Sequence, residues 1–365
     1  MYIVTNRQID ESERGLKIFG TVPSSKGPNE LRLVKVTRSG NSYRTELIDD
    51  KLSEDDVKKI NSDLDLALDP KQDWYASLSV AAETLSQAER EKKHVLFYAH
   101  GYNNDLNDIV DTAQDLEQSY NVIVVVFSWP SNGGGAVSGT LSYLSDKADA
   151  RASATAFSRF ADKVRGYHEL ISRSREELWF EKAKAKHPSN PQKAQELFTE
   201  LANKDCKVTL NLLCHSMGNY LLKHALVPSS SAFRQMIFFF FCLVAADTNN
   251  ENHADWVDAM DFRTRLYIVI NEGDFALAWS RRKPGEAQKV RLGHSLDVLN
   301  ARNAKYINVT GADWVENKHT YFTGEAVQKN RQLHTVFTDL FEGNVAENNP
   351  QAALKYRVDL NAYEL

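Results

Sequence analysis

A serine at position 216 has the sequence context of a catalytic nucleophile. It follows a short apolar run at residues 207–213 and precedes residues 219–227, whose apolar side chains have helical spacing. A strained strand-to-helix turn exposes a serine hydroxyl at the end of a sheet strand, provided that small neighbours let the helix and the strand approach closely. The sequence C-H-S-M-G at residues 214–218 therefore predicts a nucleophile at this turn. The alternative is a chance x-x-Ser-x-Gly match, which would need no flanking strand and helix.

Such a serine needs further groups before it can act. Its hydroxyl is a weak nucleophile until an imidazole takes its proton, and a buried carboxylate must hold that imidazole in the correct tautomer. Attack on a carbonyl then creates an oxyanion, which backbone N–H groups stabilise. We expect those donors to be the N–H of Met217, directly after the serine at the helix start, and the N–H of Tyr102, in the loop after His100 and Gly101.

The residues around these groups predict a substrate pocket that includes His100, Gly101, Trp129 and His215. His100 could be a second base, but we expect it to fix the oxyanion loop by hydrogen bonding. Trp129, together with the glycines at residues 133–135, could form a pocket wall. A tryptophan at a strand end is equally common in a core.

Alternating strand and helix signals predict the elements that position these residues. We expect strands at residues 94–99, 122–127, 207–213, 236–245, 265–271 and 305–309, and a closing helix at 325–342. This alternation is typical of an α/β protein with a mostly parallel central sheet and helices on both faces. The first 50 residues add three strand-like segments, at residues 2–5, 31–36 and 43–48, and helices follow at 53–66 and 73–91.

Three motifs resemble the alpha/beta-hydrolase superfamily. They are H-G-Y-N at residues 100–103, F-S-W-P-S at 127–131 and H-S-M-G-N at 215–219, each at the end of a predicted strand. Together they look like a little-characterised bacterial group of that superfamily, and the resemblance covers about residues 90 to 343. One departure is Cys214, where the superfamily commonly has glycine. Alanine is also common there, so a small apolar side chain is compatible with the turn.

The resemblance implies that the acid and the histidine follow the serine in that order along the chain. Two aspartates end predicted strands, Asp247 and Asp274. Asp274 is favoured because it follows the strand after next from the nucleophile, the commoner position in this superfamily. Asp247 is the alternative acid, and it could instead cap a helix or be a structural carboxylate near the pocket.

Three later histidines could be the base. His334 falls within a predicted helix among apolar residues, and His294 could cap a helix. His319 lies in a polar loop between the last strand and the last helix, where the superfamily carries its base. The predicted catalytic triad is therefore Ser216, Asp274 and His319.

The predicted organisation has three parts. Residues 1–93 supply N-terminal strands and helices, residues 94–343 form the hydrolase core, and residues 344–365 form a tail. Within the core, residues 169–205 are charged and rich in helix formers, and they read as a helical insertion that could cover the site as a lid. The alternatives are a longer solvated crossover helix or a contact in a homo-oligomer. The tail is strand-like at residues 354–360 and could pair with a sheet edge or remain loose.

Composition limits the classes of function. The net charge of −5 gives no general footprint for nucleic-acid binding, and no H-E-x-x-H, paired C-x-x-C or P-loop motif indicates a metal or nucleotide cofactor. The most apolar run, residues 236–246, is too short for stable insertion into a membrane. Three cysteines and an N-terminus without signal-peptide features favour a reducing compartment, and we expect a cytoplasmic protein.

The sequence thus predicts a serine hydrolase, without cofactor, that cleaves a carboxylic ester, thioester or amide of a small-molecule acyl substrate. A carboxylic ester is the preferred class. The alternative is a hydrolase-fold protein that acts as a binding or scaffold module with an incomplete triad. The acyl length and the leaving group depend on pocket shape, which these motifs leave open.

Overall fold

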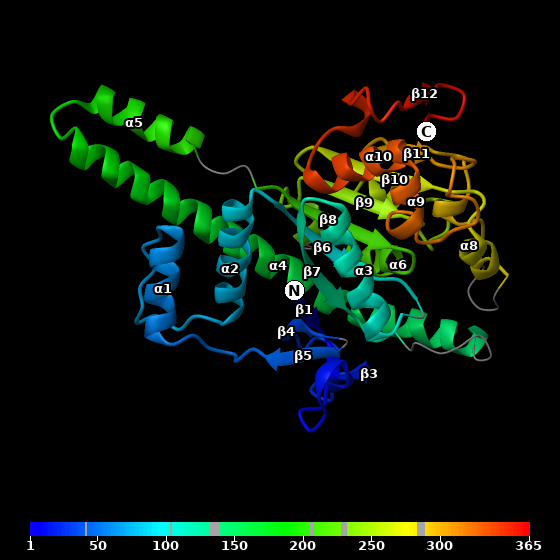
Figure 1. Ribbon diagram of the computed structural model, residues 1–365, viewed down its shortest axis with the longest axis horizontal. Coiled ribbons are helices and arrows are strands. Elements are labelled where there is room, and N and C mark those ends of the chain that lie inside the picture. Colours follow the sequence, from blue (N-terminus) through cyan, green and yellow to red (C-terminus); the bar gives the residue numbers. More distant parts are fainter. Residues whose placement is uncertain (41, 103, 132–138, 205–207, 228–231, 283–288) are drawn as a thin grey trace. The chain divides into compact units, whose positions relative to one another are not determined.

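The computed structural model describes residues 1–40, 42–102, 104–131, 139–204, 208–227, 232–282 and 289–365. The chain forms two compact units (Figure 1). Unit 1 contains residues 1–47, 94–161 and 209–365, and unit 2 contains residues 48–93 and 162–208. The predicted N-terminal part, residues 1–93, is thus divided between the two units. The predicted insertion at 169–205 belongs to unit 2, and the tail belongs to unit 1.

Unit 1 is built around a mixed sheet of eleven strands among the described residues. Their order across the sheet is β12 (Lys355–Arg357), β13 (Ala362–Glu364), β11 (Ala304–Asn308), β10 (Arg265–Ile270), β9 (Phe240–Val244), β8 (Leu210–His215), β6 (His94–Ala99), β7 (Val122–Ser128), β1 (Tyr2–Thr5), β4 (Arg32–Ser39) and β5 (Ser42–Leu47). The pairs β12–β13, β1–β4 and β4–β5 are antiparallel, and all other pairs are parallel. The predicted fold class, a mostly parallel α/β sheet with antiparallel N-terminal strands, is confirmed.

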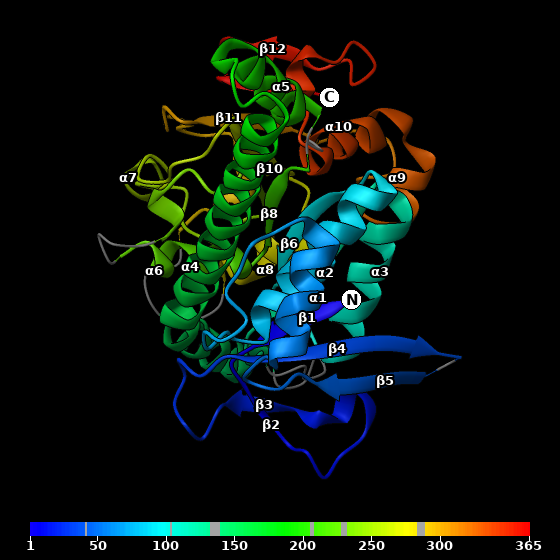
Figure 2. The ribbon, with the colours of Figure 1, turned by 90° about the vertical axis from the view of Figure 1, so that its left-hand side faces the viewer.

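Helices pack on both faces of this sheet (Figure 2). They are α3 (Leu106–Ser119), the first part of α4 (Gly139–Lys186), α6 (Gly218–Ala225), α7 (Ala254–Val257), α8 (Phe275–Ser280), α9 (Gly324–Lys329) and α10 (Arg331–Glu342). Neighbouring residues on a strand point to opposite faces. Phe97 and Phe127 therefore pack on Phe160 and Phe157 of α4, with ring centroids 5.4 and 4.7 Å apart. Tyr98, next in β6, belongs to the core that α3 and α10 cover.

Several predicted boundaries are wrong for local reasons. The predicted helix at 325–342 is two helices, because the Asn330 backbone is extended and its side chain accepts a hydrogen bond from the Leu333 N–H at 2.9 Å. Helix α4 is continuous from residue 139 to 186, so it runs without a break into the predicted insertion at 169–205. The strand predicted at 354–360 is a short hairpin of β12 and β13, and β13 pairs with β11.

A second, two-stranded sheet in unit 1 has no counterpart in the sequence prediction. It pairs β2 (Arg7–Ile9) with β3 (Phe19–Pro23), and the 3-10 helix η1 (Gly15–Ile18) lies between them. Further 3-10 turns are η3 (Ala232–Arg234), η4 (Leu292–His294) and η5 (Ala346–Asn348). The Arg7 side chain in β2 is buried, with 1% of its surface exposed.

Unit 2 is helical. It contains α1 (Glu54–Leu64), α2 (Ser77–Glu91), residues 162–186 of α4 and α5 (Pro191–Lys204). The Ser53 and Asp56 side chains cap the start of α1 reciprocally, as in a capping box. Apolar residues of α1, α2 and α4 form its core, including Val57, Leu78 and Ile171.

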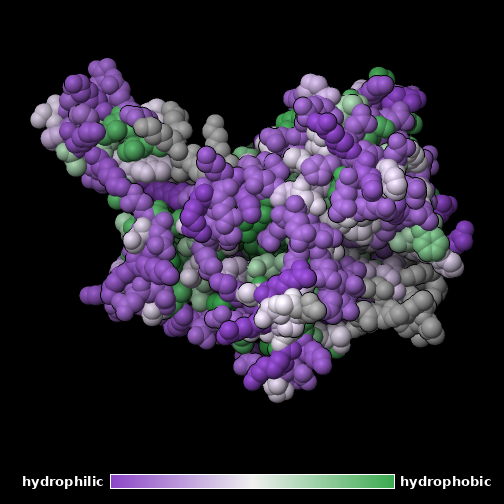
Figure 3. Space-filling model, viewed as in Figure 1, coloured by the Kyte–Doolittle hydropathy of each residue, from purple (hydrophilic) through white to green (hydrophobic). Residues whose placement is uncertain are grey.

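The exposed face in Figure 3 is predominantly hydrophilic, with small scattered apolar areas. This agrees with a sequence in which 25% of the residues are charged. Among the described helices, none has both the length and the apolar character that a membrane span requires.

The turn between β8 and α6 depends on a close backbone contact. A Cβ atom at Gly218 would lie 2.5 Å from the carbonyl oxygen of Ala99 and 2.9 Å from that of His100. Glycine at 218 therefore lets the start of α6 lie directly against the end of β6, which brings the two strand ends together.

We predict that Gly218→Ala destabilises the protein by about 1 to 3 kcal/mol, because the new methyl group forces the helix away from β6. Gly166→Ala is the matched control, since Gly166 is exposed in α4 and a Cβ there meets nothing within 4 Å. The control should stabilise by about 0.5 to 1 kcal/mol through helix propensity. Urea unfolding followed by circular dichroism measures both changes, and equal stability of the two variants would contradict this packing argument.

Candidate active site

Ser216 follows β8 directly and occupies a strained turn. Its φ angle is 52°, in the left-handed region that residues other than glycine rarely adopt. The Ser216 N–H donates to the carbonyl of Val244 in β9 at 3.1 Å. The Asn219 side-chain amide donates to the carbonyls of Cys214, Ser216 and Val244. These bonds hold the strained backbone in place at the carboxyl ends of β8 and β9.

Gly101, at the end of β6, lies beside the Ser216 side chain. A Cβ atom at position 101 would lie 2.8 Å from the Ser216 Cβ and 3.3 Å from its Oγ. Any larger residue would therefore collide with the serine. The loop that carries Tyr102 thus begins within contact distance of the predicted nucleophile.

Asp274 and His319 are joined by a short hydrogen bond. The His319 Nδ1 lies 2.7 Å from Asp274 Oδ2. The other carboxylate oxygen, Oδ1, accepts from the Leu277 N–H at 3.0 Å, so Asp274 also caps the start of α8. Asp274 is fully buried, whereas the His319 side chain is 24% exposed. In a neutral imidazole whose Nδ1–H donates to a carboxylate, Nε2 carries no proton and can accept one.

The loop that carries His319 is held by two side chains. The Asn271 amide, at the end of β10, donates to the carbonyls of Glu316 and Lys318 at 3.1 and 3.2 Å. The His215 Nε2 donates to the carbonyl of His319 at 3.2 Å, and the two imidazole centroids are 4.6 Å apart. The residue directly before the predicted nucleophile therefore touches the predicted base.

His215 is neutral in this environment. Burial, and then the charge on the neighbouring His319, lower the pKa of His215 well below its ordinary value. Because its Nε2–H donates to a carbonyl, its Nδ1 carries no proton. That nitrogen is buried and has no hydrogen-bond partner in the described part of the chain. His215 thus adds no positive charge beside His319.

Ser216 directly follows β8, Asp274 lies in the turn after β10, and His319 lies in the segment after β11. The side chains of Ser216 and His319 are both described and make no hydrogen bond to each other. Such bonds are often long or misaligned in a site without substrate and tighten when substrate binds. The predicted catalytic roles of these residues therefore stay predictions that rest on the Asp274–His319 contact and on the strained serine.

His100 and Trp129 are fully buried. Their rings stack, with centroids 5.2 Å apart and planes 3° apart, and the Trp129 Nε1–H donates to the His100 carbonyl at 3.0 Å. Trp129 thus packs behind His100 in the core and presents no exposed face as a pocket wall. The glycines at 133–135 of that expected wall lie outside the described residues.

The predicted oxyanion donors are the residue that follows Ser216 and the residue that follows Gly101. Met217 is buried and is the residue that caps the start of α6. Its N–H has no hydrogen-bond acceptor among the described residues, as expected for the first N–H groups of a helix. Tyr102 follows Gly101, and its ring packs edge-to-face on Tyr143 with centroids 5.3 Å apart.

Asp247, the alternative acid, contacts no histidine among the described residues. Its Oδ1 lies 3.0 Å from Nε of Arg291, and its Oδ2 accepts from the Tyr143 hydroxyl at 3.0 Å. The Ser280 hydroxyl also donates to Asp247. Burial, and then the charge of Asp247, raise the pKa of Tyr143. Asp247 is thus the buried partner of a cation, and its N–H donates to the Ser216 carbonyl at 3.1 Å. Its place as the alternative acid stays a prediction.

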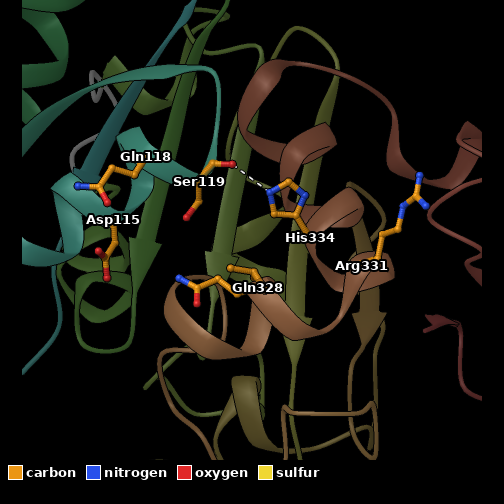
Figure 4. A pocket seen from close by; sticks show the side chains of 7 residues that line it. Asp115, Gln118, Ser119, Gln328, Arg331 and His334 are labelled. Carbon is orange, nitrogen blue, oxygen red and sulfur yellow. Dashed lines mark hydrogen bonds between the residues drawn. The ribbon is translucent and has the colours of Figure 1, made fainter.

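The other two candidates for the base, His294 and His334, do not bind a predicted triad residue. His334 in α10 lines a groove of about 600 Å³ between α3 and the helices α9 and α10, where its Nε2 donates to the Ser119 carbonyl at 3.0 Å (Figure 4). His294 ends η4 and is half-buried, and burial lowers its pKa. Neither imidazole hydrogen-bonds Asp274 or Asp247.

In the part of the chain that the structure describes, no group of histidines, cysteines and carboxylates has the arrangement of a metal site. Cys214 and Cys242 are free and buried, and burial raises the pKa of both thiols. A protonated, buried thiol two residues before the turn is a packing group, and it does not compete with Ser216 as a nucleophile.

Sequence reasoning gave no role to several residues that shape this site. Asn271 and Ser128 lie at the ends of apolar strands. A polar residue that ends an apolar run is the sequence feature that could have identified them. Arg291 lies in a polar stretch and Arg7 in a three-residue strand. Neither arginine has a periodic pattern that marks it as buried.

Comparison with known proteins identifies one match. The family model described as "Alpha/beta hydrolase of unknown function (DUF900)" matches residues 77–172 and 179–328, which is well over half of the chain. These residues include Ser216, Asp274 and His319. No curated protein and no solved structure matches the chain.

We predict that Arg291→Met destabilises the protein by roughly 3 to 5 kcal/mol, because it leaves the Asp247 carboxylate buried without its cation. The matched control is Arg302→Met, since the Arg302 side chain is 87% exposed in its pair with Asp258. An exposed pair contributes about 1 kcal/mol or less. Urea unfolding of both variants is the measurement, and a small effect at Arg291 would mean that hydroxyl groups alone can hold Asp247.

Proposed function

Because the chain belongs to the family of alpha/beta hydrolases that it matches, we propose that it is a serine hydrolase. It cleaves a carboxylic ester, thioester or amide of a small-molecule acyl substrate, with a carboxylic ester as the first choice, through an acyl-serine intermediate. The observation that carries this proposal is the 2.7 Å contact between His319 Nδ1 and Asp274 Oδ2, beside a serine in a strained turn. Members of one fold family differ in function, so the proposal rests on this constellation of side chains.

Each group has a distinct role in the proposed reaction. Ser216 Oγ attacks the substrate carbonyl while His319 Nε2 takes the hydroxyl proton, and Asp274 stabilises the imidazolium that forms. The N–H groups of Met217 and Tyr102 donate to the oxyanion. His319 then gives its proton to the leaving group, and a water molecule activated by the same imidazole releases the acyl group from the serine.

The surroundings of the constellation favour this chemistry. Asp274 is fully buried and both of its oxygens accept hydrogen bonds, which keeps the carboxylate in one orientation toward His319. Neutral His215 adds no cation that would hinder protonation of the base. Cys214 and Cys242 are free thiols, and a cytoplasmic location is part of the proposal. Whether residues 169–205 act as a lid or as a contact between copies stays a prediction.

The first test is Ser216→Ala, which should abolish labelling by a fluorophosphonate probe and hydrolysis of short-chain p-nitrophenyl esters. The change removes one oxygen, so circular dichroism should show the folded protein. Cys214→Ala is the matched control in the same turn and should keep both labelling and turnover, because the buried thiol is protonated. Equal labelling of wild type and Ser216→Ala would exclude the nucleophile, and a wild type without labelling or turnover would favour the binding module.

We predict that Asp274→Asn lowers kcat by up to about ten-thousand-fold, because an amide favours the wrong imidazole tautomer. The asparagine oxygen can still cap α8 through the Leu277 N–H, so the fold should persist. Asp247→Asn, measured on folded protein at equal concentration, should lower kcat much less, because Asp247 does not contact His319. A larger loss at Asp247 than at Asp274 would reverse the assignment of the acid.

A further inference from the structure

We infer that Arg7, Ser128 and His100 form a hydrogen-bond relay that orients the Tyr102 N–H for the oxyanion hole. The relay starts in the two-stranded sheet and ends at the peptide beside Ser216. Arg7 and Ser128 are positioning residues, since neither touches the reacting atoms. The inference rests on the proposed function, because that function is what gives the Tyr102 N–H its role.

The relay begins at a buried guanidinium. The Arg7 Nε–H donates to Ser128 Oγ at 2.9 Å, and its other groups donate to the Gly20 carbonyl at 3.1 Å and to Ser131 Oγ at 3.2 Å. These acceptors are uncharged oxygens. Burial lowers the pKa of Arg7 to about 10, and three carboxylates oppose that shift, those of Asp146, Asp149 and Asp105. Arg7 is therefore a cation at neutral pH and can only donate.

One arrangement of protons lets the next two bonds run in the same direction as the bond from Arg7. The His100 Nδ1 lies 2.9 Å from the Gly101 carbonyl oxygen, which can only accept, so Nδ1 carries the proton. Burial, and then the charge of Arg7, lower the pKa of His100 to about 3, while hydrogen bonds to the Gly101 and Trp129 backbone act in the opposite direction. The ring is therefore neutral. Its bare Nε2 then accepts from the Ser128 hydroxyl at 3.4 Å. That hydroxyl is turned toward His100 because its oxygen already accepts from Arg7.

The last bond of the relay fixes a peptide plane. In a planar trans peptide the C=O and the N–H point in opposite directions. Because His100 holds the Gly101 C=O, it also sets the direction of the Tyr102 N–H in the same peptide. Gly101 lies against Ser216, since a Cβ atom at position 101 would lie 3.3 Å from Ser216 Oγ. This peptide therefore borders the nucleophile. Stacking on Trp129 fixes the plane of the His100 ring, and the bond from the Ser128 hydroxyl further stabilises the Nδ1–H form.

Ser128→Ala tests the relay, with Thr5→Val as the matched control. The Thr5 hydroxyl is buried in the same cluster but donates to the Ser128 carbonyl at 2.7 Å and does not reach His100. The first measurement is independent of catalysis. Nitrogen-15 NMR of the imidazoles, with His100 assigned by the signal lost in His100→Gln, should show the Nδ1–H tautomer in the wild type and no titration between pH 5 and 8.

In Ser128→Ala, we expect a mixture of His100 tautomers and a displaced Tyr102 amide signal. The reason is that the variant removes the hydroxyl that donates to Nε2, so the Nδ1–H form loses one of its two hydrogen bonds. Thr5→Val should leave both signals as in the wild type. A wild type with Nε2–H, or a Ser128→Ala variant with an unchanged His100 tautomer, would overturn the relay even if the enzyme is active.

The second measurement is steady-state hydrolysis of the p-nitrophenyl ester. An oxyanion donor acts mainly in the transition state, so Ser128→Ala should lower kcat about tenfold and leave KM within about twofold, whereas Thr5→Val should keep both. An equal fall of kcat in the two variants would indicate a merely structural role and overturn the proposal. Changed NMR signals in a protein whose wild type has no turnover would support the relay while refuting the proposed hydrolase.

Discussion

The site depends on one steric constraint, the close approach of two backbone turns at the ends of β6 and β8. Gly218 lies against the carbonyls that end β6, and Gly101 lies against the Ser216 side chain. Both contacts exclude a Cβ atom. Because both turns pack this closely, the loop that begins at Gly101 and the start of α6 are both held next to Ser216. The strained φ of Ser216 is the conformational cost of this arrangement, and the bonds of Asn219 offset part of it.

Two buried arginines, Arg7 and Arg291, differ in the charge of their hydrogen-bond partners. Arg291 pairs directly with the Asp247 carboxylate, whereas the hydrogen bonds of Arg7 end on uncharged oxygens. A paired charge fixes geometry by attraction to one partner. A charged donor whose hydrogen bonds in the described part of the chain end on neutral oxygens instead orients each hydroxyl among them, since a hydroxyl that accepts from it directs its own proton elsewhere. The asymmetry explains why Asp247 serves the packing under the site while Ser128 can pass an orientation on to His100.

The central strands of the sheet could be predicted from the sequence because they are almost wholly apolar and are bounded by polar turns. Strands β6, β7 and β10 lie within one residue of the predicted ranges. The prediction failed where a single side chain decides the boundary, as at Asn330 between α9 and α10. The two-stranded sheet escaped prediction because Arg7-Gln-Ile9 has no apolar alternation. The predicted triad members come together at neighbouring strand ends, as the topology requires, but their catalytic roles stay predictions. No sequence pattern assigns Arg291 to Asp247 or Arg7 to Ser128, because those contacts join segments more than 40 residues apart.

The hairpin of β12 and β13 determines which strand lies at one border of the sheet. Strand β13 covers β11, the strand that leads toward His319, and the N–H of Leu365 donates to the Asn308 carbonyl at 3.1 Å. The outermost strand then becomes β12, a three-residue strand with exposed Lys355 and Arg357. At the opposite border, β5 carries exposed residues in alternation. Short or charged borders give a neighbouring chain little backbone to pair with. The apolar β11, by contrast, would offer unpaired backbone hydrogen-bonding groups if the hairpin detached, so the hairpin keeps the edge of β11 paired within its own chain.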